Sequence, residues 1–206
     1  NKKIQESWDC FLRFRRSDPK ERREKLLKLG DILKRDSEKL AKTITLEMGK
    51  PLRESRKEIE RSIEQCTYFA NHIEEFLKSE ELEKGDAKKS YISYEPLGPI
   101  YHVTPFNFPI YLQFRGSIAA LAMGNTVLNK NPASCPECGI FIEKAFHEAG
   151  FTNGEFINLI ISQEQSECVI KNKFIRGVSF TGSTEGGSKV ASLAGKYFKK
   201  NVMELG

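Results

Sequence analysis

The chain has 206 residues, of which 39% are hydrophobic and 30% are charged, a composition that excludes a disordered or membrane-embedded protein. No apolar run reaches the roughly 18 residues that span a bilayer, and the polar opening residues predict no signal peptide. The net charge of +5 could suit a nucleic-acid surface, but the basic runs are mixed with acids and no nucleic-acid motif accompanies them. We therefore expect a soluble globular protein that binds neither nucleic acid nor a membrane.

The five cysteines are irregularly spaced along the chain: Cys10, Cys66, Cys135, Cys138 and Cys168. An odd number without regular spacing does not predict a disulfide framework, and a reducing cytoplasm is the simplest setting. Cys135-Pro136-Glu137-Cys138 has the C-x-x-C spacing of zinc and redox sites, but one such pair supplies only two metal ligands. We interpret this spacing as chance at a helix start, and we predict no metal site and a cytoplasmic location.

We expect residues 1–86 to form an N-terminal helical part of the domain. Asp18, Pro19 and Glu21 indicate a helix start with an N-cap, a proline at the first helical position and a capping box. A second helix is expected to end at Gly49. A third, longer helix carries an apolar stripe that consists of Ile59, Ile63, Cys66, Phe69, Ala70, Ile73 and Phe76.

From residue 87 onward, short apolar strands alternate with helical stretches. The expected strands are 98–103, 126–128, 156–161, 177–180 and 201–204, after a separate strand over 90–95. The expected helices are 112–122, 136–149, 164–171 and 183–195. This alternation predicts an α/β fold for residues 87–206, a Rossmann-like parallel sheet flanked by helices. Such sheets bind ligands at the carboxyl ends of their strands.

Three segments at predicted strand ends carry unusual chemistry. In Thr104-Pro105-Phe106-Asn107-Phe108-Pro109, two prolines stiffen a loop whose asparagine amide could donate to an oxygen that gains charge. Lys130 ends an apolar strand, where a cation could hold ribose hydroxyls or a phosphate. Phe180-Thr181-Gly182-Ser183-Thr184-Glu185-Gly186-Gly187 turns from a strand into a helix start, which suits a pyrophosphate. Taken singly, each is better explained as an ordinary turn or strand end, and the last departs from the G-x-G-x-x-G fingerprint.

Together these segments resemble the aldehyde dehydrogenase superfamily from about residue 10 to the last residue. The resemblance is carried by Leu46-Glu47-Met48-Gly49-Lys50-Pro51, Glu95-Pro96-Leu97-Gly98-Pro99-Ile100, Pro105-Phe106-Asn107-Phe108-Pro109, Ala122-Met123-Gly124-Asn125-Thr126-Val127, Phe180-Thr181-Gly182-Ser183-Thr184-Glu185 and Met203-Glu204-Leu205-Gly206. Phe106 stands where the family more commonly has tryptophan. The order of these motifs along the chain also matches the family.

The resemblance implies roles for individual residues. Asn107 resembles the side-chain member of the oxyanion hole, and Glu204 resembles the general base that activates the deacylating water. Lys130 resembles the lysine that holds the adenosine ribose, and Ser183 resembles the pyrophosphate contact. The other positions expected to bind the cofactor are Val103, Thr104, Pro105, Phe106, Ala133, Gly182, Gly186, Glu204 and Leu205.

The implied function is the oxidation of an aldehyde to a carboxylic acid with NAD or NADP. A cysteine thiolate attacks the aldehyde, Asn107 and a backbone N–H stabilise the oxyanion, and hydride passes to the nicotinamide. Water activated by Glu204 then hydrolyses the thioester. In the family the cysteine follows the motif found here at 203–206, and none of the five cysteines matches it. We therefore expect the catalytic domain outside these residues, the 206 residues alone to be inactive, and the full-length protein to be a homo-oligomer.

Two alternatives remain open. A CoA-acylating or reductive member of the superfamily would pass the thioester to another acceptor, although many such members lack the glutamate that Glu204 resembles. The chain could also be a non-catalytic nucleotide-binding fragment.

Residues 130–135 are more similar to the branch that contains one group of succinate-semialdehyde dehydrogenases. Ala133 stands where many NAD-preferring members have an acid, so the resemblance implies that the full-length enzyme accepts NADP. Succinate semialdehyde is accordingly a candidate substrate.

Overall fold

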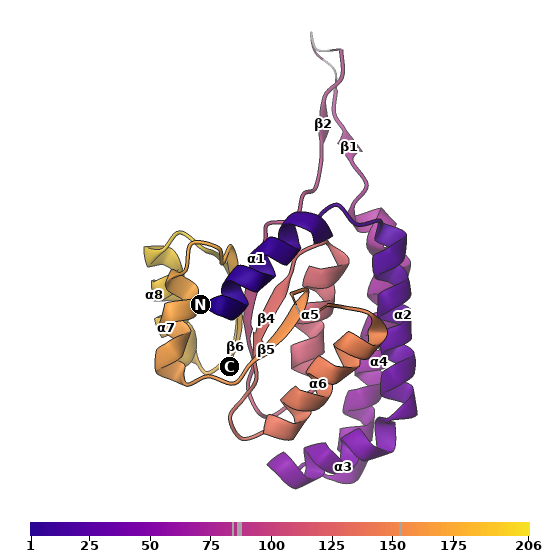
Figure 1. The fold of residues 1–206 in the computed structure, drawn as a ribbon, viewed down its shortest axis with the longest axis vertical. Helices are drawn as coiled ribbons and strands as arrows, with labels where there is room; N and C mark the ends of the chain where they lie inside the picture. Colours follow the sequence, from indigo (N-terminus) through magenta and orange to yellow (C-terminus); the bar gives the residue numbers. More distant parts are fainter. Residues whose placement is uncertain (84, 86–87, 153) are drawn as a thin grey trace.

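A computed structural model describes residues 1–83, 85, 88–152 and 154–206. Its centre is a five-stranded sheet with the order β5-β4-β3-β6-β7, in which all neighbouring strands are parallel. The strands are β3 (Ile100–Val103), β4 (Val127–Lys130), β5 (Phe156–Leu159), β6 (Gly177–Gly182) and β7 (Lys200–Leu205). Helices cover both faces of the sheet (Figure 1), so the predicted α/β, Rossmann-like fold is confirmed.

Eight helices are found in the part of the chain that the structure describes. They are α1 (Lys2–Phe14), α2 (Pro19–Arg35), α3 (Ser37–Met48), α4 (Leu52–Phe76), α5 (Tyr111–Ala122), α6 (Pro136–Ala149), α7 (Gln163–Lys171) and α8 (Thr184–Lys196). We call α2, α3 and α4, which pack on one another and against α5 and α6, the helical layer. None of the helices in these described residues is both long and apolar enough to cross a membrane.

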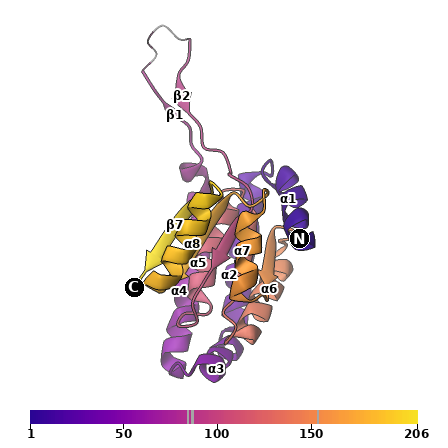
Figure 2. The ribbon, with the colours of Figure 1, turned by 90° about the vertical axis from the view of Figure 1, so that its left-hand side faces the viewer.

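The two faces of the sheet carry separate hydrophobic cores, because side chains alternate along each strand. Val127 and Phe156 belong to one core, whereas the next residues, Leu128 and Ile157, belong to the other. The first core includes α5, α6 and the helical layer, and the second includes residues of α7 and α8 on the opposite face (Figure 2). Two-sided burial explains why β4 and β5 each begin with two consecutive apolar residues.

Several helix ends follow the signals in the sequence. Asp18 caps α2 by accepting a hydrogen bond from the backbone N–H of Lys20, and α6 spans the predicted range at both ends. Gly49 and Gly150 end α3 and α6 with φ angles of 77° and 104°. Glycine is favoured at these positions because a side chain strains a left-handed backbone.

Three local predictions were wrong. Glu21 completes no capping box that the structure shows, since its carboxylate lies 2.9 Å from the Lys25 amine, one turn further along α2. The strand over 90–95 shrinks to β2 (Tyr91–Ile92), which pairs only with β1 (Glu80–Glu81) in a hairpin that projects from the body (Figure 1). Phe76 is partly exposed because it is the last residue of α4 and lies beyond most of the core. The boundary placed between 86 and 87 falls outside the described residues.

The order of the strands determines where a ligand can bind. The chain runs from β3 outward to β4 and β5, and then returns to the other side of β3 to form β6 and β7. Because all five strands are parallel, their carboxyl ends meet at one edge of the sheet. The loops after β3 and β6 therefore diverge at a topological switch point, which is where open α/β sheets bind ligands.

Candidate active site

The loop after β3 presents Asn107 at the carboxyl edge of the sheet. Pro105 is half-buried and Pro109 is buried, while Phe106 and Asn107 between them are exposed. Thr104 begins the loop, and its buried hydroxyl has no hydrogen-bond partner among the described residues. A buried hydroxyl without a partner is uncommon, so a ligand or water group is expected to satisfy it. The loop combines a stiff backbone with an exposed amide, as an oxyanion donor requires.

Glu204 lies on β7, opposite Thr181 in the pairing with β6. Its carboxylate is 3.5 Å from the guanidinium of Arg115, and about half of each side chain is exposed. Arg115 belongs to α5, the helix that follows the Asn107 loop, so this contact brings the end of β7 close to α5. Leu205, the next residue, is also exposed at this edge. The predicted base is therefore accessible to solvent and has a cation beside it.

The turn from β6 into α8 places backbone N–H groups at the same edge. Ser183 is the N-cap of α8, and its hydroxyl accepts a hydrogen bond from the N–H of Gly186 at 3.2 Å. A Cβ atom at Gly182 would lie 2.7 Å from the Phe180 ring, and one at Gly186 would lie 2.9 Å from it. A side chain at either position would therefore require the Phe180 ring to shift. The free N–H groups of the first turn and the helix dipole favour a phosphate.

Lys130 ends β4, directly opposite the end of β3 at Val103. The residue is 9% exposed, and its amine has no ion-pair partner in the part of the chain that the structure describes. Burial lowers the pKa of Lys130 because the charged form loses hydration. Ala133 and Ser134, three and four residues further on, are exposed. A partly buried cation without a counter-ion suits a ligand that brings hydroxyl or phosphate oxygens.

The predicted cofactor positions therefore lie at the ends of β3, β4, β6 and β7 or in the loops that follow them. Val103 and Pro105 are half-buried beside the exposed Phe106. The Thr104 hydroxyl and the Lys130 amine, which have no hydrogen-bond or ion-pair partner among the described residues, fit a dinucleotide together with the glycine turn after β6. Ala133 lies in the loop after β4, at the same edge.

Four of the five cysteines lie in the interior of the protein. All five are free, and Cys168 is exposed. Burial raises the pKa of the Cys66, Cys135 and Cys138 thiols, because the thiolate would lose hydration. No group of three or more metal-ligating side chains is found among the described residues.

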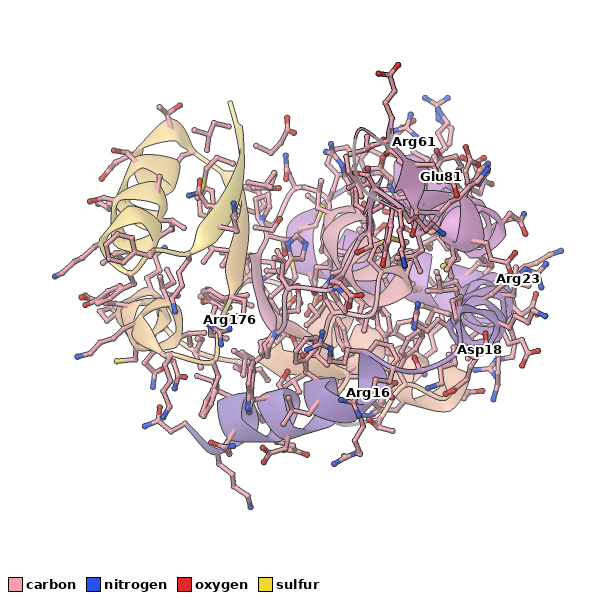
Figure 3. The ribbon with its side chains drawn as sticks, turned by 90° about the horizontal axis from the view of Figure 1, so that it is seen from above. Arg16, Asp18, Arg23, Arg61, Glu81 and Arg176 are labelled. Carbon is pink, nitrogen blue, oxygen red and sulfur yellow. The ribbon has the colours of Figure 1, made fainter. Side chains whose placement is uncertain are left out.

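Sequence reasoning missed two groups of residues beside this edge. One is Arg115, which lines a groove between α4 and α5 together with Arg61, Glu64, Gln65, Tyr68, Phe69, Tyr111 and Ala119. Arg61 projects from the side of the molecule that carries the helical layer (Figure 3). Arg115 could have been found, because it is the only charged residue in 111–122. The other group is Glu47, Lys50 and Glu58, which contact the starts of α5 and α6 and one another. Glu47 and Lys50 lie in the motif at 46–51, but no pattern in the sequence indicates these contacts, and Glu58 belongs to no motif.

Comparison with known proteins gives one consistent family. The model described as "Aldehyde dehydrogenase family" matches residues 1–206. The chain is 35% identical over 206 residues to the probable succinate-semialdehyde dehydrogenase [NADP(+)] of Synechocystis sp., which covers 100% of this chain and 45% of that relative. It is 34% identical over 196 residues to the succinate semialdehyde dehydrogenase [NAD(P)+] Sad of Escherichia coli, covering 95% and 42%.

A solved structure extends the likeness to three dimensions. It is the succinic semialdehyde dehydrogenase from Streptococcus pyogenes in complex with NADP+, which is 34% identical and superposes with a TM-score of 0.96. The match covers 100% of this chain and 45% of that one. The chain thus spans less than half the length of the relatives it matches.

Proposed function

The chain belongs to the aldehyde dehydrogenase family, and on this premise we propose that the whole protein oxidises an aldehyde to a carboxylic acid with NADP or NAD. One observation carries the proposal. The exposed amide of Asn107 and the exposed carboxylate of Glu204 lie at the same edge of the sheet as the buried Lys130 and the glycine turn after β6. That edge therefore combines features suited to a dinucleotide with an oxyanion donor and a base.

Each residue then has a defined task. Asn107 donates to the oxygen that becomes an oxyanion when a cysteine outside these residues attacks the aldehyde. Glu204 accepts a proton from the water that hydrolyses the resulting thioester. Lys130 holds oxygens of the adenosine ribose, and the first turn of α8 holds the pyrophosphate. The dinucleotide, when bound, supplies the hydride acceptor.

We propose an aldehyde that carries a carboxylate, such as succinate semialdehyde, as the substrate. The groove between α4 and α5 contains the guanidinium groups of Arg61 and Arg115. Arg115 also lies beside Glu204, so a carboxylate bound to its guanidinium would lie near the reacting end of the site. The similarity to succinate-semialdehyde dehydrogenases supports the same substrate class.

The substrate proposal predicts a selective loss in Arg115→Leu. A charge-assisted hydrogen bond contributes about 1.5–3 kcal/mol, so kcat/KM for succinate semialdehyde should fall by about 10–100-fold. Butanal has the same chain length and no carboxylate, and its kcat/KM should change by less than about threefold. The measurement is NADPH production with both aldehydes by the whole enzyme. Equal losses would show that Arg115 acts through Glu204 and does not bind the substrate carboxylate.

The cofactor proposal predicts that NADP is accepted and that Ala133→Glu shifts the preference toward NAD. A glutamate at this exposed position would repel the 2′-phosphate of NADP and could bond the 2′-hydroxyl of NAD. The ratio of kcat/KM for the two cofactors should shift by at least about tenfold, equivalent to ~1.4 kcal/mol. Ala133→Gln has the same size without the charge and should shift the ratio much less. A wild type that rejects NADP, or an unchanged ratio in Ala133→Glu, would place Ala133 away from the ribose.

A further inference from the structure

The helix that follows the Asn107 loop is capped by a residue from another helix. Ile110 is the N-cap of α5, and its apolar side chain cannot accept a hydrogen bond from the first N–H groups of the helix. Instead, Glu58 of α4 accepts hydrogen bonds at Oε1 from the backbone N–H groups of Ile110 and Tyr111, at 2.8 and 3.0 Å. Free N–H groups and the positive end of the dipole make a helix start favourable for a carboxylate. The end of the Asn107 loop is thereby fixed to the helical layer.

The second oxygen of Glu58 holds a cation against the same loop. Oε2 contacts the amine of Lys50, and the side chains of this pair are 0% and 9% exposed. The Lys50 amine also lies 3.8 Å from the centre of the Phe108 ring. Phe108 is the residue directly after Asn107. One buried ion pair therefore touches the loop on both sides of Pro109, at Phe108 and at Ile110.

A buried ion pair of this kind needs a reason beyond stability. Removing two charges from water costs several kcal/mol, and well-packed apolar side chains of similar volume often stabilise a fold equally well. Here the pair provides directed bonds, since the carboxylate accepts from two adjacent N–H groups and a cation at once. Such bonds fix the backbone of residues 108–111 in one position, which apolar packing alone would not do.

We propose that Glu58, held in place by Lys50, is a positioning residue for catalysis that fixes the loop carrying the Asn107 amide. The inference rests on the role proposed above for Asn107. An oxyanion donor must be held at its working position, because its stabilising effect depends on a preorganised geometry and a misplacement of about 1 Å can cost about 100-fold in rate. Glu58 itself lies in the helical layer and touches no reacting atom in this arrangement.

The chain contains a matched control. Glu47 of α3 caps α6 in the same manner, accepting from the backbone N–H groups of Glu137 and Cys138 at 2.7 and 2.9 Å. Helix α6 follows the loop after β4, which contains Ala133 and not Asn107. Glu47→Gln should therefore alter the KM for NADP and slow acylation much less than Glu58→Gln does.

The experiment is a double-mutant cycle on the whole enzyme, with the burst of NADPH measured by stopped flow at saturating cofactor. Glu58→Gln should slow the burst by about tenfold, and the amide should preserve the fold because it can still accept from Ile110 and Tyr111. In an Asn107→Ala background, Glu58→Gln should cause no further slowing. Lys50→Met, which keeps both capping bonds, is the second variant and should show the same non-additivity with a smaller effect.

The outcomes distinguish a failure of the positioning role of Glu58 from a failure of the role of Asn107. If Glu58→Gln slows the burst equally in both backgrounds, Glu58 has a structural role only and the positioning proposal is overturned. If Asn107→Ala alone leaves the burst unchanged, the role of Asn107 fails and the positioning proposal fails with it. A Glu47→Gln variant that slows the burst as strongly as Glu58→Gln would also overturn it, because any helix cap would then have the same effect.

Discussion

Asn107→Ala should slow the acylation burst of the whole enzyme by about 10²–10³-fold, as the loss of other oxyanion donors does. The side chain is exposed at the carboxyl edge of the sheet, in a loop stiffened by Pro105 and Pro109. Its amide should bond the aldehyde oxygen more strongly once that oxygen is charged. Removing it therefore raises the barrier to attack and leaves substrate binding almost unchanged. The measurement is the rate of the NADPH burst at saturating aldehyde.

An exposed asparagine elsewhere provides the control for this variant. Asn71 lies on α4, where its side-chain oxygen is 3.5 Å from a guanidinium nitrogen of Arg23. Asn71→Ala removes the same amide from the surface and should leave the burst within about twofold of wild type. A burst in Asn107→Ala that keeps its rate but requires far more aldehyde would indicate a contact for substrate binding only.

The sheet could be predicted from sequence because its signal is local. Most strands contain a short apolar segment, and glycines or prolines mark many of the ends between strands and helices. The prediction of a strand over 90–95 was wrong because the segment alternates apolar and polar residues as a strand does, whereas only Tyr91 and Ile92 pair with another strand. Alternation shows that a segment can be extended, but pairing depends on a second segment at the right distance.

Some residues of the candidate site could likewise be located from the sequence, and others could not. The motif residues lie at or just after the ends of predicted strands, and parallel strands bring those ends to one edge. Their roles came from the family resemblance, because each segment taken singly is better explained as an ordinary turn or strand end. Glu58 could not be found, because it bonds Ile110, 52 positions further along the chain, and a glutamate on a helix usually faces solvent. Contacts of this kind depend on how α4 packs against α5, which no pattern within either helix indicates.

Glu204→Gln should leave the burst of NADPH close to one equivalent per active site while steady-state turnover falls by about 10²–10⁴-fold. Glutamine keeps the shape of the side chain and can still accept a hydrogen bond from Arg115, 3.5 Å away in the wild type. It cannot take a proton from water, so the thioester forms and then persists. Burst amplitude and steady-state rate are both read from one stopped-flow trace.

A control for Glu204→Gln removes a carboxylate that lies away from the candidate site. Glu54 is a partly exposed carboxylate 3.2 Å from Arg53 on the outside of the helical layer, and Glu54→Gln should change neither phase. If Glu204→Gln lowers the burst and the steady state by the same factor, Glu204 does not act in deacylation alone. If CoA releases the thioester of the wild type faster than water does, the protein is an acylating member of the family. Water as the preferred acceptor, lost only when Glu204 loses its charge, is the result expected of a base placed at the end of β7 beside a cation.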